Sequence, residues 1–540
     1  MPTDAVMDGE RMMILREEVH FGRAMRCYAP RPANVWEHLS RVIHQNPDAV
    51  AVVEGDAART YAEVDRESAS LAALLARSGV RQGDRVAVML GNCTDSVRAV
   101  LAVVRLGAVL VAIGTRSRAT ELSHFFTDAE PAALIHAPEF SLEIDRASMV
   151  PGCRFDVSQP LWQAALAAND VAPATPDIAE EALFALLYTS GTTGQPKGAM
   201  LTHLGVVHSC LHWREAFGLG DDETTLVCVP WAHVSGLCGV VMPFLFQGAK
   251  LVMVPEFKRR EVLELARVHA ITHALMVPAM YNLCLLEPDL ADFKLDRWRI
   301  AAYGGAPMPE PTIRRLAQAF PQLAMCNAYG ATETTSPATI MPPGEGTSRS
   351  DSIGRVVTCG DIRVMDDEGR EVPPGTDGEF WIAGPMVVPG YWRNTQATDK
   401  AFVGAYWRSG DIGSIDADGY VRIADRKKDM IIRGGFKVYP AEVENVISAI
   451  DGVAEVAVVG RPDPMLGEEV IAFVATHCAG VTAAKVRDWC SANLSDYKVP
   501  AQVIIGSEPL PRNANGKIQK ASLRERALTL PSDARAGVPA

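Results

Sequence analysis

A stretch rich in hydroxyl residues and glycine has the composition needed to bind the phosphates of a nucleotide. It reads Tyr188-Thr-Ser-Gly-Thr-Thr-Gly-Gln-Pro-Lys-Gly198 and lies between the apolar run 183–187 and a helical pattern that begins near Thr202. A strand that leads into such a loop presents consecutive backbone N–H groups to an anion, because no large side chains obstruct them. The stretch is not a Walker A loop, since Gly198 rather than Ser or Thr follows Lys197. Taken alone, it also fits a flexible linker.

The elements that must position this loop alternate between strand and helix on both sides of it. Short apolar runs predict strands, and periodic segments between them predict helices. The predicted strands are 49–53, 85–90, 226–229, 250–254, 273–277 and 299–303. The predicted helices are 61–77, 95–106, 260–269 and 309–320. Apolar strands separated by helices are typical of parallel βαβ units, whereas the segment 137–176 is expected to be irregular.

The pattern changes in the last third of the chain. Between residues 353 and 406, short strands separated by turns predict a small β-rich subdomain. The charge run Asp425-Arg-Lys-Lys-Asp429 fits either a solvated turn or a domain hinge. The sequence therefore predicts an α/β protein with a large N-terminal domain, 1–424, made of two βαβ-layered subdomains and the β-rich subdomain. A hinge at 425–430 and a small, mobile α+β C-terminal domain at 431–540 follow.

Composition limits the class of protein. A chain of 540 residues is too long for a single core, and a net charge of -13 argues against a nucleic-acid surface. The 11 cysteines are an odd number without a C-x-x-C pair, so neither a disulfide framework nor a zinc knuckle is expected. The most membrane-like run, 97–113, contains Arg98 and Arg105, which lipid would disfavour. We therefore expect a cytoplasmic protein without a membrane span, and the sequence does not decide between a monomer and a homodimer.

A series of motifs follows the phosphate-loop candidate in a fixed order along the chain. The series is Tyr188–Gly198, Trp231-Ala-His233, Tyr303-Gly-Gly-Ala306, Tyr329-Gly-Ala-Thr-Glu-Thr334, Ser409-Gly-Asp411, Asp425–Gly435 and Asn515-Gly-Lys517. In this order the chain resembles the adenylate-forming superfamily, which includes AMP-binding acyl- and aryl-CoA synthetases, peptide-synthetase adenylation domains and beetle luciferases. The resemblance covers nearly the full length.

The resemblance implies an acid–thiol ligase of the AMP-forming acyl-CoA synthetase type, which uses ATP, Mg²⁺ and coenzyme A. In that reaction a carboxylate attacks the α-phosphorus of ATP to give an acyl-adenylate and pyrophosphate, and the CoA thiol then displaces AMP. Both partners in the first step are anions, so the enzyme must neutralise charge and align the attack.

The resemblance also assigns roles to individual residues. Phosphate binding falls to Thr189, Ser190, Gly191, Thr192, Thr193, Gly194 and Lys197. Adenine binding falls to Gly304, Gly305, Ala306, Tyr329 and Gly330, and the ribose is bound by Asp411 and Arg426. Glu333 would hold Mg²⁺, which prefers oxygen ligands, and Thr332 lies beside it among the catalytic residues.

The remaining assignments concern catalysis and the CoA step. Lys517 would stabilise the charge that develops during adenylation, and Lys428 matches the hinge about which the C-terminal domain rotates. Gly434 and Gly435 would then face the pantetheine arm of CoA, because a missing Cβ leaves room for it. His233 would border the acyl pocket. The small Ala232 before it, where a bulky residue is usual, implies a wider pocket mouth.

Each of these residues also has an ordinary structural explanation. Gly-Gly and Ser-Gly-Asp are common turn sequences, Glu333 suits a helix N-terminus, and a lone histidine such as His233 is more often structural. A further group, His203, His208 and His212, shares one predicted helix without an acidic partner, so we expect no metal site there.

Three activities compete within the superfamily. An amino-acid adenylation domain would carry an aspartate where His233 stands, and nothing in the sequence supports a luciferin pocket, so a CoA ligase is preferred. The alternatives are a stand-alone enzyme that loads a carrier protein and a non-catalytic nucleotide-binding protein, although Lys517, Glu333 and Asp411 are intact.

The sequence narrows the substrate to a class of acids and does not identify it. The segments that line the acyl pocket in relatives correspond to 234–242, 276–281, 303–306 and 327–337. They contain no lysine or arginine, which disfavours a second substrate carboxylate. We expect a small carboxylic acid with a medium-chain aliphatic or an aromatic body, and the sequence does not choose between them.

Overall fold

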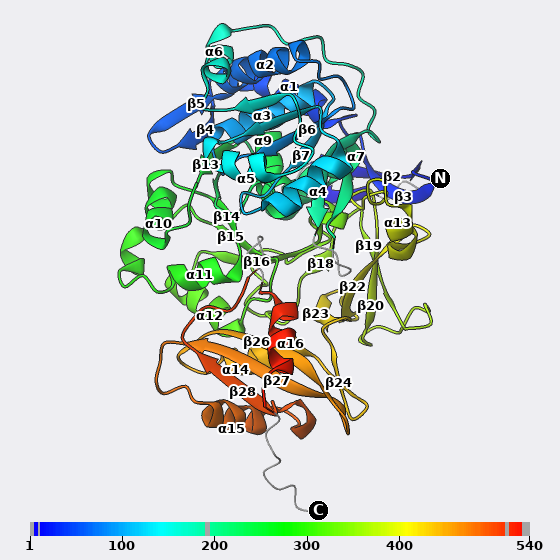
Figure 1. Cartoon of the computed structure of the whole chain (residues 1–540), viewed down its shortest axis with the longest axis vertical. Helices are drawn as coiled ribbons and strands as arrows, with labels where there is room; N and C mark the ends of the chain where they lie inside the picture. The colour runs from blue at the N-terminus through cyan, green and yellow to red at the C-terminus, as the bar shows by residue number, and fades with distance from the viewer. Residues whose placement is uncertain (1–4, 9–10, 190–194, 513–517, 532–540) are drawn as a thin grey trace, which may run out of the picture. The chain divides into compact units, whose positions relative to one another are not determined.

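The computed structural model describes residues 5–8, 11–189, 195–512 and 518–531 (Figure 1). The chain forms two compact units. The first comprises Met1–Gly305, Arg315–Ile362 and Trp381–Arg408, and the second comprises Ala306–Arg314, Arg363–Phe380 and Ser409–Ala540. The predicted boundary at residue 424 and the predicted hinge at 425–430 stay predictions.

A six-stranded sheet of the first unit contains the strand that leads to the predicted phosphate loop. The strand order is β11-β10-β7-β6-β8-β9, and all strands are parallel except β11, which runs antiparallel to β10. The strands are β6 (Arg85–Met89), β7 (Val109–Ala112), β8 (Ala133–His136), β9 (Arg154–Asp156), β10 (Leu183–Thr189) and β11 (Lys197–Thr202). Their apolar side chains pack against Phe125 and Phe126 of α4 (Ala119–Ala129), as expected for a buried parallel sheet.

A nine-stranded sheet forms the second layer of this unit, in the order β18-β17-β16-β15-β14-β12-β13-β4-β5. The six strands from β16 to β4 are parallel, so the predicted βαβ units are confirmed. The strands are β4 (Val50–Glu54), β5 (Ala57–Thr60), β12 (Thr224–Val227), β13 (Lys250–Met253), β14 (His273–Met276), β15 (Ile300–Tyr303), β16 (Ala324–Tyr329), β17 (Thr339–Ile340) and β18 (Arg355–Val356).

Helix α3 (Thr94–Arg105) is buried between these two sheets. It contacts β4 of the nine-stranded sheet and both β6 and β7 of the six-stranded sheet. Figure 1 shows it beside α1 (Val35–Gln45) and α2 (Tyr61–Arg77). Its arginines are paired: the Nε of Arg98 lies 2.7 Å from Glu67, and Arg105 pairs with Asp65. This explains the apolar run 97–113, and no helix of the described part of the chain is long and apolar enough to span a membrane.

The other helices described up to residue 401 lie between the strands along the chain. Those before residue 250 are η1 (Pro138–Phe140), α5 (Ser141–Arg146), α6 (Pro160–Ala168), α7 (His203–Phe217), α8 (Val234–Gly236), the π-helix η2 (Leu237–Val241) and α9 (Met242–Gln247). Those that follow, up to residue 401, are α10 (Arg259–Val268), α11 (Pro278–Cys284), η3 (Leu290–Phe293), α12 (Glu310–Ala319), η4 (Thr332–Thr334) and α13 (Thr395–Ala401).

The expectation of an irregular segment at 137–176 is wrong. The segment contains α5, β9 and α6 in addition to η1. These elements are too short to show a period in the sequence, and tertiary packing defines them. In α6, for example, Trp162 and Ala165 are buried and the helix packs against α2.

Two smaller sheets complete the part of the chain before residue 427. The N-terminal strands β1 (Ala5–Asp8), β2 (Arg11–His20) and β3 (Arg23–Ala29) form an antiparallel sheet. The predicted β-rich subdomain is confirmed as the sheet β19-β20-β22-β21, in which β23 also pairs with β22. Its strands are β19 (Asp361–Met365), β20 (Gly378–Ala383), β21 (Phe402–Val403), β22 (Tyr406–Ile415) and β23 (Val421–Arg426).

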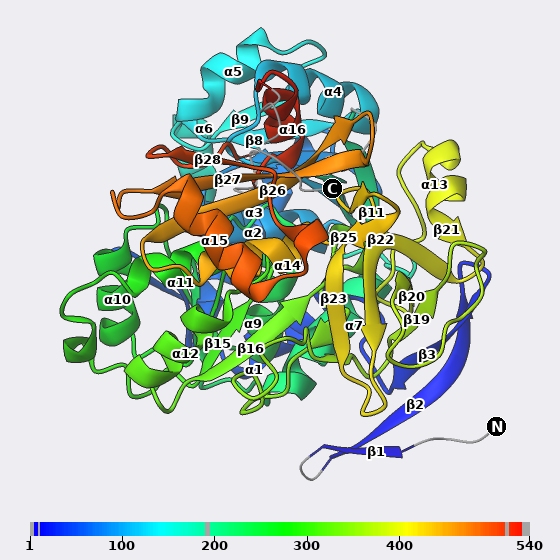
Figure 2. The ribbon, with the colours of Figure 1, turned by 90° about the horizontal axis from the view of Figure 1, so that it is seen from below.

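The C-terminal part of the second unit is an α+β fold with its own core, as predicted. Its sheet has the order β25-β24-β27-β26, with β28 beside β27. Alternate residues of β27 face opposite sides: Val470 and Ala472 pack in one core with α14 and α15, whereas Ile471 and Phe473 pack in another with α16. Figure 2 shows these helices around the sheet. The elements are β24 (Ile431–Arg433), β25 (Phe436–Val438), α14 (Pro440–Ser448), β26 (Val453–Asp463), β27 (Gly467–Thr476), α15 (Ala483–Asn493), η5 (Asp496–Lys498), β28 (Gln502–Gly506) and α16 (Lys520–Leu528).

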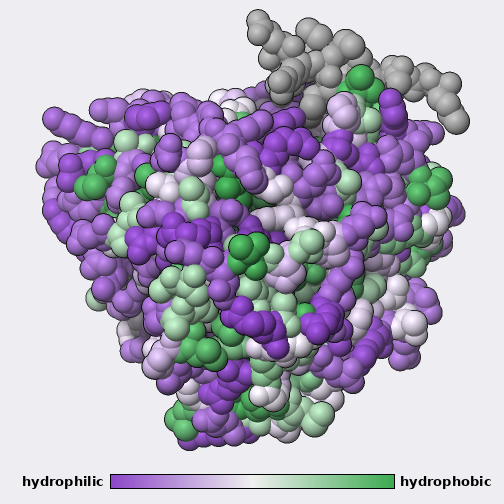
Figure 3. Space-filling model, turned by 90° about the horizontal axis from the view of Figure 1, so that it is seen from above, coloured by the Kyte–Doolittle hydropathy of each residue, from purple (hydrophilic) through white to green (hydrophobic). Residues whose placement is uncertain are grey.

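Hydrophilic side chains cover most of the face shown in Figure 3. Among the described residues, exposed apolar side chains such as Leu161 and Val171 lie far apart from most others of their kind in the sequence. Scattered apolar residues of this kind are normal on a protein surface and indicate no particular binding site.

Candidate active site

The predicted phosphate loop joins two antiparallel strands. Thr189 at the end of β10 pairs with Lys197 at the start of β11. The helix predicted near Thr202 begins at His203, and sequence reasoning missed the strand β11 that precedes it. The predicted contacts that fall outside the described residues stay predictions; they are those of Ser190, Gly191, Thr192, Thr193 and Gly194.

Tyr391, which sequence reasoning did not select, contacts two of the predicted site residues. Its hydroxyl donates a hydrogen bond to Oε1 of Glu333 at 2.8 Å. The Nζ of Lys197 lies 5.1 Å from the centre of its ring, a distance at which an ammonium is attracted to the aromatic face. Burial raises the pKa of Tyr391, and the neighbouring Glu333 raises it further, so the phenol stays protonated and acts as the donor. The structure therefore brings Lys197 and Glu333 to one tyrosine.

Glu333 follows the carboxyl end of β16, in the short helix η4. Glu333 is 9% exposed, so its carboxylate is a buried charge of the first unit. Thr334 fixes the turn, because its hydroxyl accepts a hydrogen bond from the N–H of Ala331 at 2.9 Å. The carbonyl of Glu333 accepts a hydrogen bond from the N–H of Val388 at 2.9 Å. Thr332 is the first residue of η4 and is half-buried.

The predicted adenine-binding residues of the first unit follow two adjacent parallel strands. Gly304 and Gly305 come after β15, and Tyr329 and Gly330 lie at the end of β16. The carboxyl ends of neighbouring parallel strands are where ligands usually bind in such sheets. Gly304 also has a structural reason, because a Cβ there would lie 2.3 Å from the carbonyl oxygen of Ala328.

His233 lies directly before α8, at the start of a predicted wall of the acyl pocket. It is half-buried, and a Cβ built on Gly114, just after β7, would lie 3.7 Å from its Nε2. The residues that follow it, Leu237–Val241, form the π-helix η2 and are all buried. Gly239 within η2 is closely packed, because a Cβ built on it would lie 3.5 Å from the side chain of Trp213 and 3.4 Å from that of Leu275. Helical irregularities of this kind are frequent at functional sites.

The second unit contains the predicted ribose-binding pair. Asp411 of β22 and Arg426 of β23 are partners in the sheet register, and Nε of Arg426 lies 3.1 Å from Oδ1 of Asp411. Asp411 is 3% exposed, and its N–H donates to the hydroxyl of Ser409 at 3.0 Å. Ala306, the last residue of the predicted adenine motif, also belongs to this unit. Lys517 lies outside the described residues, so its catalytic role stays a prediction.

Gly434 and Gly435 form the two-residue turn between β24 and β25. Both have positive φ, 58° and 84°, and the N–H of Gly434 donates to the carbonyl of Leu466 at 2.7 Å. Turns that need positive φ at both positions favour glycine. The turn therefore explains both glycines locally, and their predicted contact with CoA remains a separate prediction.

Substitutions at position 435 distinguish these two explanations. Gly435→Leu is expected to destabilise the second unit by about 1–2 kcal/mol, because leucine disfavours left-handed backbone. Asparagine tolerates that backbone, so Gly435→Asn is expected to retain the melting temperature and pyrophosphate exchange, since a Cβ here meets no atom within 4 Å. If the CoA assignment is correct, the asparagine variant nevertheless has a raised KM for CoA. An unchanged KM would leave only the turn as the reason for glycine.

Two histidines of the predicted group on α7 have structural roles. His203 and His208 of α7 accept hydrogen bonds from the N–H groups of Val35 and Tyr28, at 3.3 and 3.2 Å. Burial lowers the pKa of His203 to about 4 and that of His208 to about 3, which keeps both rings neutral as acceptors.

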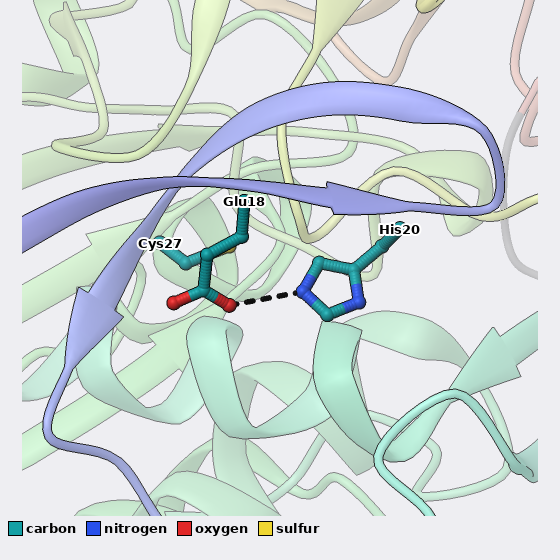
Figure 4. A group of neighbouring side chains, drawn as sticks. All are labelled: Glu18, His20 and Cys27. Carbon is teal, nitrogen blue, oxygen red and sulfur yellow. Dashed lines mark hydrogen bonds and ion pairs between the residues drawn. The ribbon is translucent and has the colours of Figure 1, made fainter.

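Among the described residues, the group with metal-binding geometry is Glu18, His20 and Cys27 of the β2–β3 hairpin (Figure 4). The Glu18 carboxylate lies 3.1 Å from Nε2 of His20 and also pairs with Arg31 at 2.6 Å. Burial raises the pKa of the Cys27 thiol to about 12. The adjacent guanidinium of Arg31 already pairs with the Glu18 carboxylate and opposes cation binding, so we interpret this cluster as a set of structural contacts that hold the hairpin.

Comparison with known proteins agrees with this arrangement. Residues 39–392 match the family described as AMP-binding enzyme, and residues 442–517 match the AMP-binding enzyme C-terminal domain. A feruloyl-CoA synthase from Amycolatopsis sp is 35% identical over 492 residues, which cover 90% of this chain and 97% of that protein. The long-chain-fatty-acid–CoA ligase FadD13 of Mycobacterium tuberculosis is 34% identical over 476 residues, covering 87% of this chain and 93% of that protein.

A solved structure shows the same fold. ATP-bound MatB from Rhodopseudomonas palustris has 32% sequence identity and a TM-score of 0.86, with 92% of this chain and 99% of that chain covered. The chain belongs to the AMP-binding enzyme family, that is, to the adenylate-forming enzymes. It is an ATP-dependent, AMP-forming acid–CoA ligase that acts through an acyl-adenylate.

Proposed function

We propose that the ligase activates a monocarboxylic acid with an apolar body, either aromatic or medium-chain aliphatic. The observation that carries this proposal is the absence of any lysine or arginine from the pocket segments around His233, 234–242, 276–281, 303–306 and 327–337. A buried second carboxylate without a cationic partner would be strongly unfavourable. Two relatives, the feruloyl-CoA synthase and the long-chain-fatty-acid–CoA ligase, are named for acids with one carboxylate and a largely apolar body, which supports the proposal.

The proposal includes the residue roles that the motifs suggest. Thr189 and Lys197, with the loop between them, bind the β- and γ-phosphates, Asp411 and Arg426 bind the ribose, and Lys517 stabilises the charge of the adenylation step. His233 borders the acid.

Magnesium fits the residues present, although a single carboxylate supplies the protein's ligand. Glu333 offers oxygen atoms in a buried setting, and Mg²⁺ is usually bound by one or two carboxylates together with substrate phosphates. When bound, the ion would neutralise part of the triphosphate charge. The task of this chain would then be to orient the Glu333 carboxylate toward the phosphates.

A matched pair of acids tests the substrate class. Octanoate and octanedioate have the same chain length and differ by one terminal carboxylate. We expect CoA-dependent AMP release from octanoate, or from an aromatic acid such as ferulate, with kcat/KM at least about 100-fold above that for octanedioate. A preference for the diacid would overturn the proposal.

The same assay distinguishes transfer of the acyl group to CoA from a second candidate function, the loading of a carrier protein. A phosphopantetheinylated carrier protein offered in place of CoA would then be the better acceptor. Equal or faster AMP release with CoA favours the CoA ligase.

A further inference from the structure

We propose that Tyr391 is a positioning residue of the adenylation site, which holds the carboxylate of Glu333 and the ammonium of Lys197 in one fixed arrangement. This inference rests on the proposed roles of these two residues in binding magnesium and phosphate. It adds a residue that lies outside the motifs from which those roles were drawn.

The two contacts of Tyr391 act on opposite charges. Its hydroxyl donates to Oε1 of Glu333 at 2.8 Å, and its ring lies 5.1 Å from Nζ of Lys197. A glutamate side chain has several rotatable bonds, and a hydrogen bond to one oxygen restricts them without adding charge. The face of the ring attracts the ammonium without neutralising it. The two contacts thus restrain the positions of both charged groups without cancelling either charge.

The backbone around Tyr391 makes this restraint rigid. Tyr391 forms a β-bridge with Ala199 of β11, and the N–H of Trp392 donates to the carbonyl of Gly198 at 2.7 Å. On the other side, the N–H of Tyr391 donates to the hydroxyl of Thr398 at 3.0 Å. The segment is therefore attached directly to the strand that carries Lys197.

A second set of contacts fixes the position of Glu333 relative to the same segment. The N–H of Val388, three residues before Tyr391, donates to the carbonyl of Glu333 at 2.9 Å. Gly390 of the same segment packs closely against Thr398, since a Cβ on it would lie 2.6 Å from Cγ2 of Thr398. The segment 388–392 consequently bridges η4 and β11, and Tyr391 is the side chain that reaches the charged groups of both.

Two substitutions at position 391 separate the two contacts. Tyr391→Phe removes the hydrogen bond to Glu333 and keeps the ring beneath Lys197, whereas Tyr391→Leu removes both. The matched control is Tyr28→Phe, which deletes another buried phenol that donates to a carboxylate, that of Glu215. Binding of ATP is measured by calorimetry with and without Mg²⁺, and pyrophosphate exchange is measured as a function of Mg²⁺ concentration.

We expect Tyr391→Phe to weaken Mg²⁺-dependent ATP binding about tenfold, the effect of losing one hydrogen bond to a charged group. Binding of ATP without metal should be unchanged, and high Mg²⁺ should restore pyrophosphate exchange. Tyr391→Leu should weaken ATP binding with and without metal, and the control should change neither. Because metal binding also stabilises a folded protein, the melting temperature is measured without Mg²⁺, and rescue by Mg²⁺ at an unchanged melting temperature distinguishes positioning from a loss of folding.

The Glu333→Gln variant distinguishes failure of this inference from failure of the proposed function. If Glu333→Gln loses the Mg²⁺-dependent part of ATP binding and Tyr391→Phe retains it, Tyr391 is not a positioning residue. If Glu333→Gln binds ATP and Mg²⁺ as the natural chain does, the metal assignment itself is wrong, and the inference fails with it.

Discussion

Lys517→Ala is expected to slow adenylation about 100- to 1,000-fold, the usual effect of removing one group that stabilises transition-state charge. The transfer of an acyl group from a supplied acyl-adenylate to CoA should stay nearly unchanged. The asymmetry arises because negative charge accumulates on the α-phosphate and the attacking carboxylate only in the first half-reaction. A compact ammonium on a flexible stem is suited to that charge.

The two half-reactions are measured separately, by pyrophosphate exchange and by CoA ester formation from prepared adenylate. Lys485→Ala serves as the control, since Lys485 is an exposed lysine of α15 in the same unit. It should leave both rates unchanged. Equal losses of both half-reactions in Lys517→Ala would contradict the proposed division of labour.

The sequence predicted most of the secondary structure because the apolar periods are clear. The helix predicted at 61–77 is α2 with the same limits, and the strand predicted at 85–90 is β6. The predictions failed where an element is defined by distant partners. Helix α6 is one example, because it packs against α2, which lies far before it in the sequence.

The same reason explains which parts of the site were found. Glu333, Lys197 and Asp411 stand in local motifs that sequence inspection can recognise. The Asp411–Arg426 contact depends on the register of β22 and β23, which is irregular between Ile412 and Gly413, so spacing along the chain does not reveal it. Tyr391 follows Pro389-Gly390, which signals only a turn, and its contacts exist only in the folded chain.

We propose Lys428 as the pivot of the predicted hinge, and contacts within the second unit support this proposal. On one side, the N–H of Lys427 donates to the carbonyl of Gly410 at 2.8 Å, and its ammonium lies 3.4 Å from Glu379 of β20. On the other side, Arg524 of α16 donates to the carbonyl of Lys428 at 3.3 Å and pairs with Asp429. Rotation about the backbone of Lys428 would therefore move the residues that contact α16 relative to Lys427, which contacts β20 and β22.

Lys428→Pro is accordingly expected to retain one half-reaction and to slow the other at least about 100-fold, the scale of a misplaced catalytic group. Lys428 is the third residue of the turn that Asp429 closes by donating to the carbonyl of Arg426 at 2.8 Å. Proline fixes φ near -65° and disfavours helical torsions at the residue before it, so the chain can no longer exchange freely between turn conformations. The N–H that proline removes donates no backbone hydrogen bond to a described residue.

The control is Lys428→Ala, which removes the charged side chain and leaves the backbone free. It should support both half-reactions at nearly the natural rates, while Lys428→Pro loses overall CoA ester formation at an unchanged melting temperature. The adenylation and transfer rates of both variants are compared with the overall turnover. If the proline variant turns over normally, residue 428 is not the pivot. If alanine is as harmful as proline, the side chain rather than the backbone is responsible, because only the proline variant restricts φ.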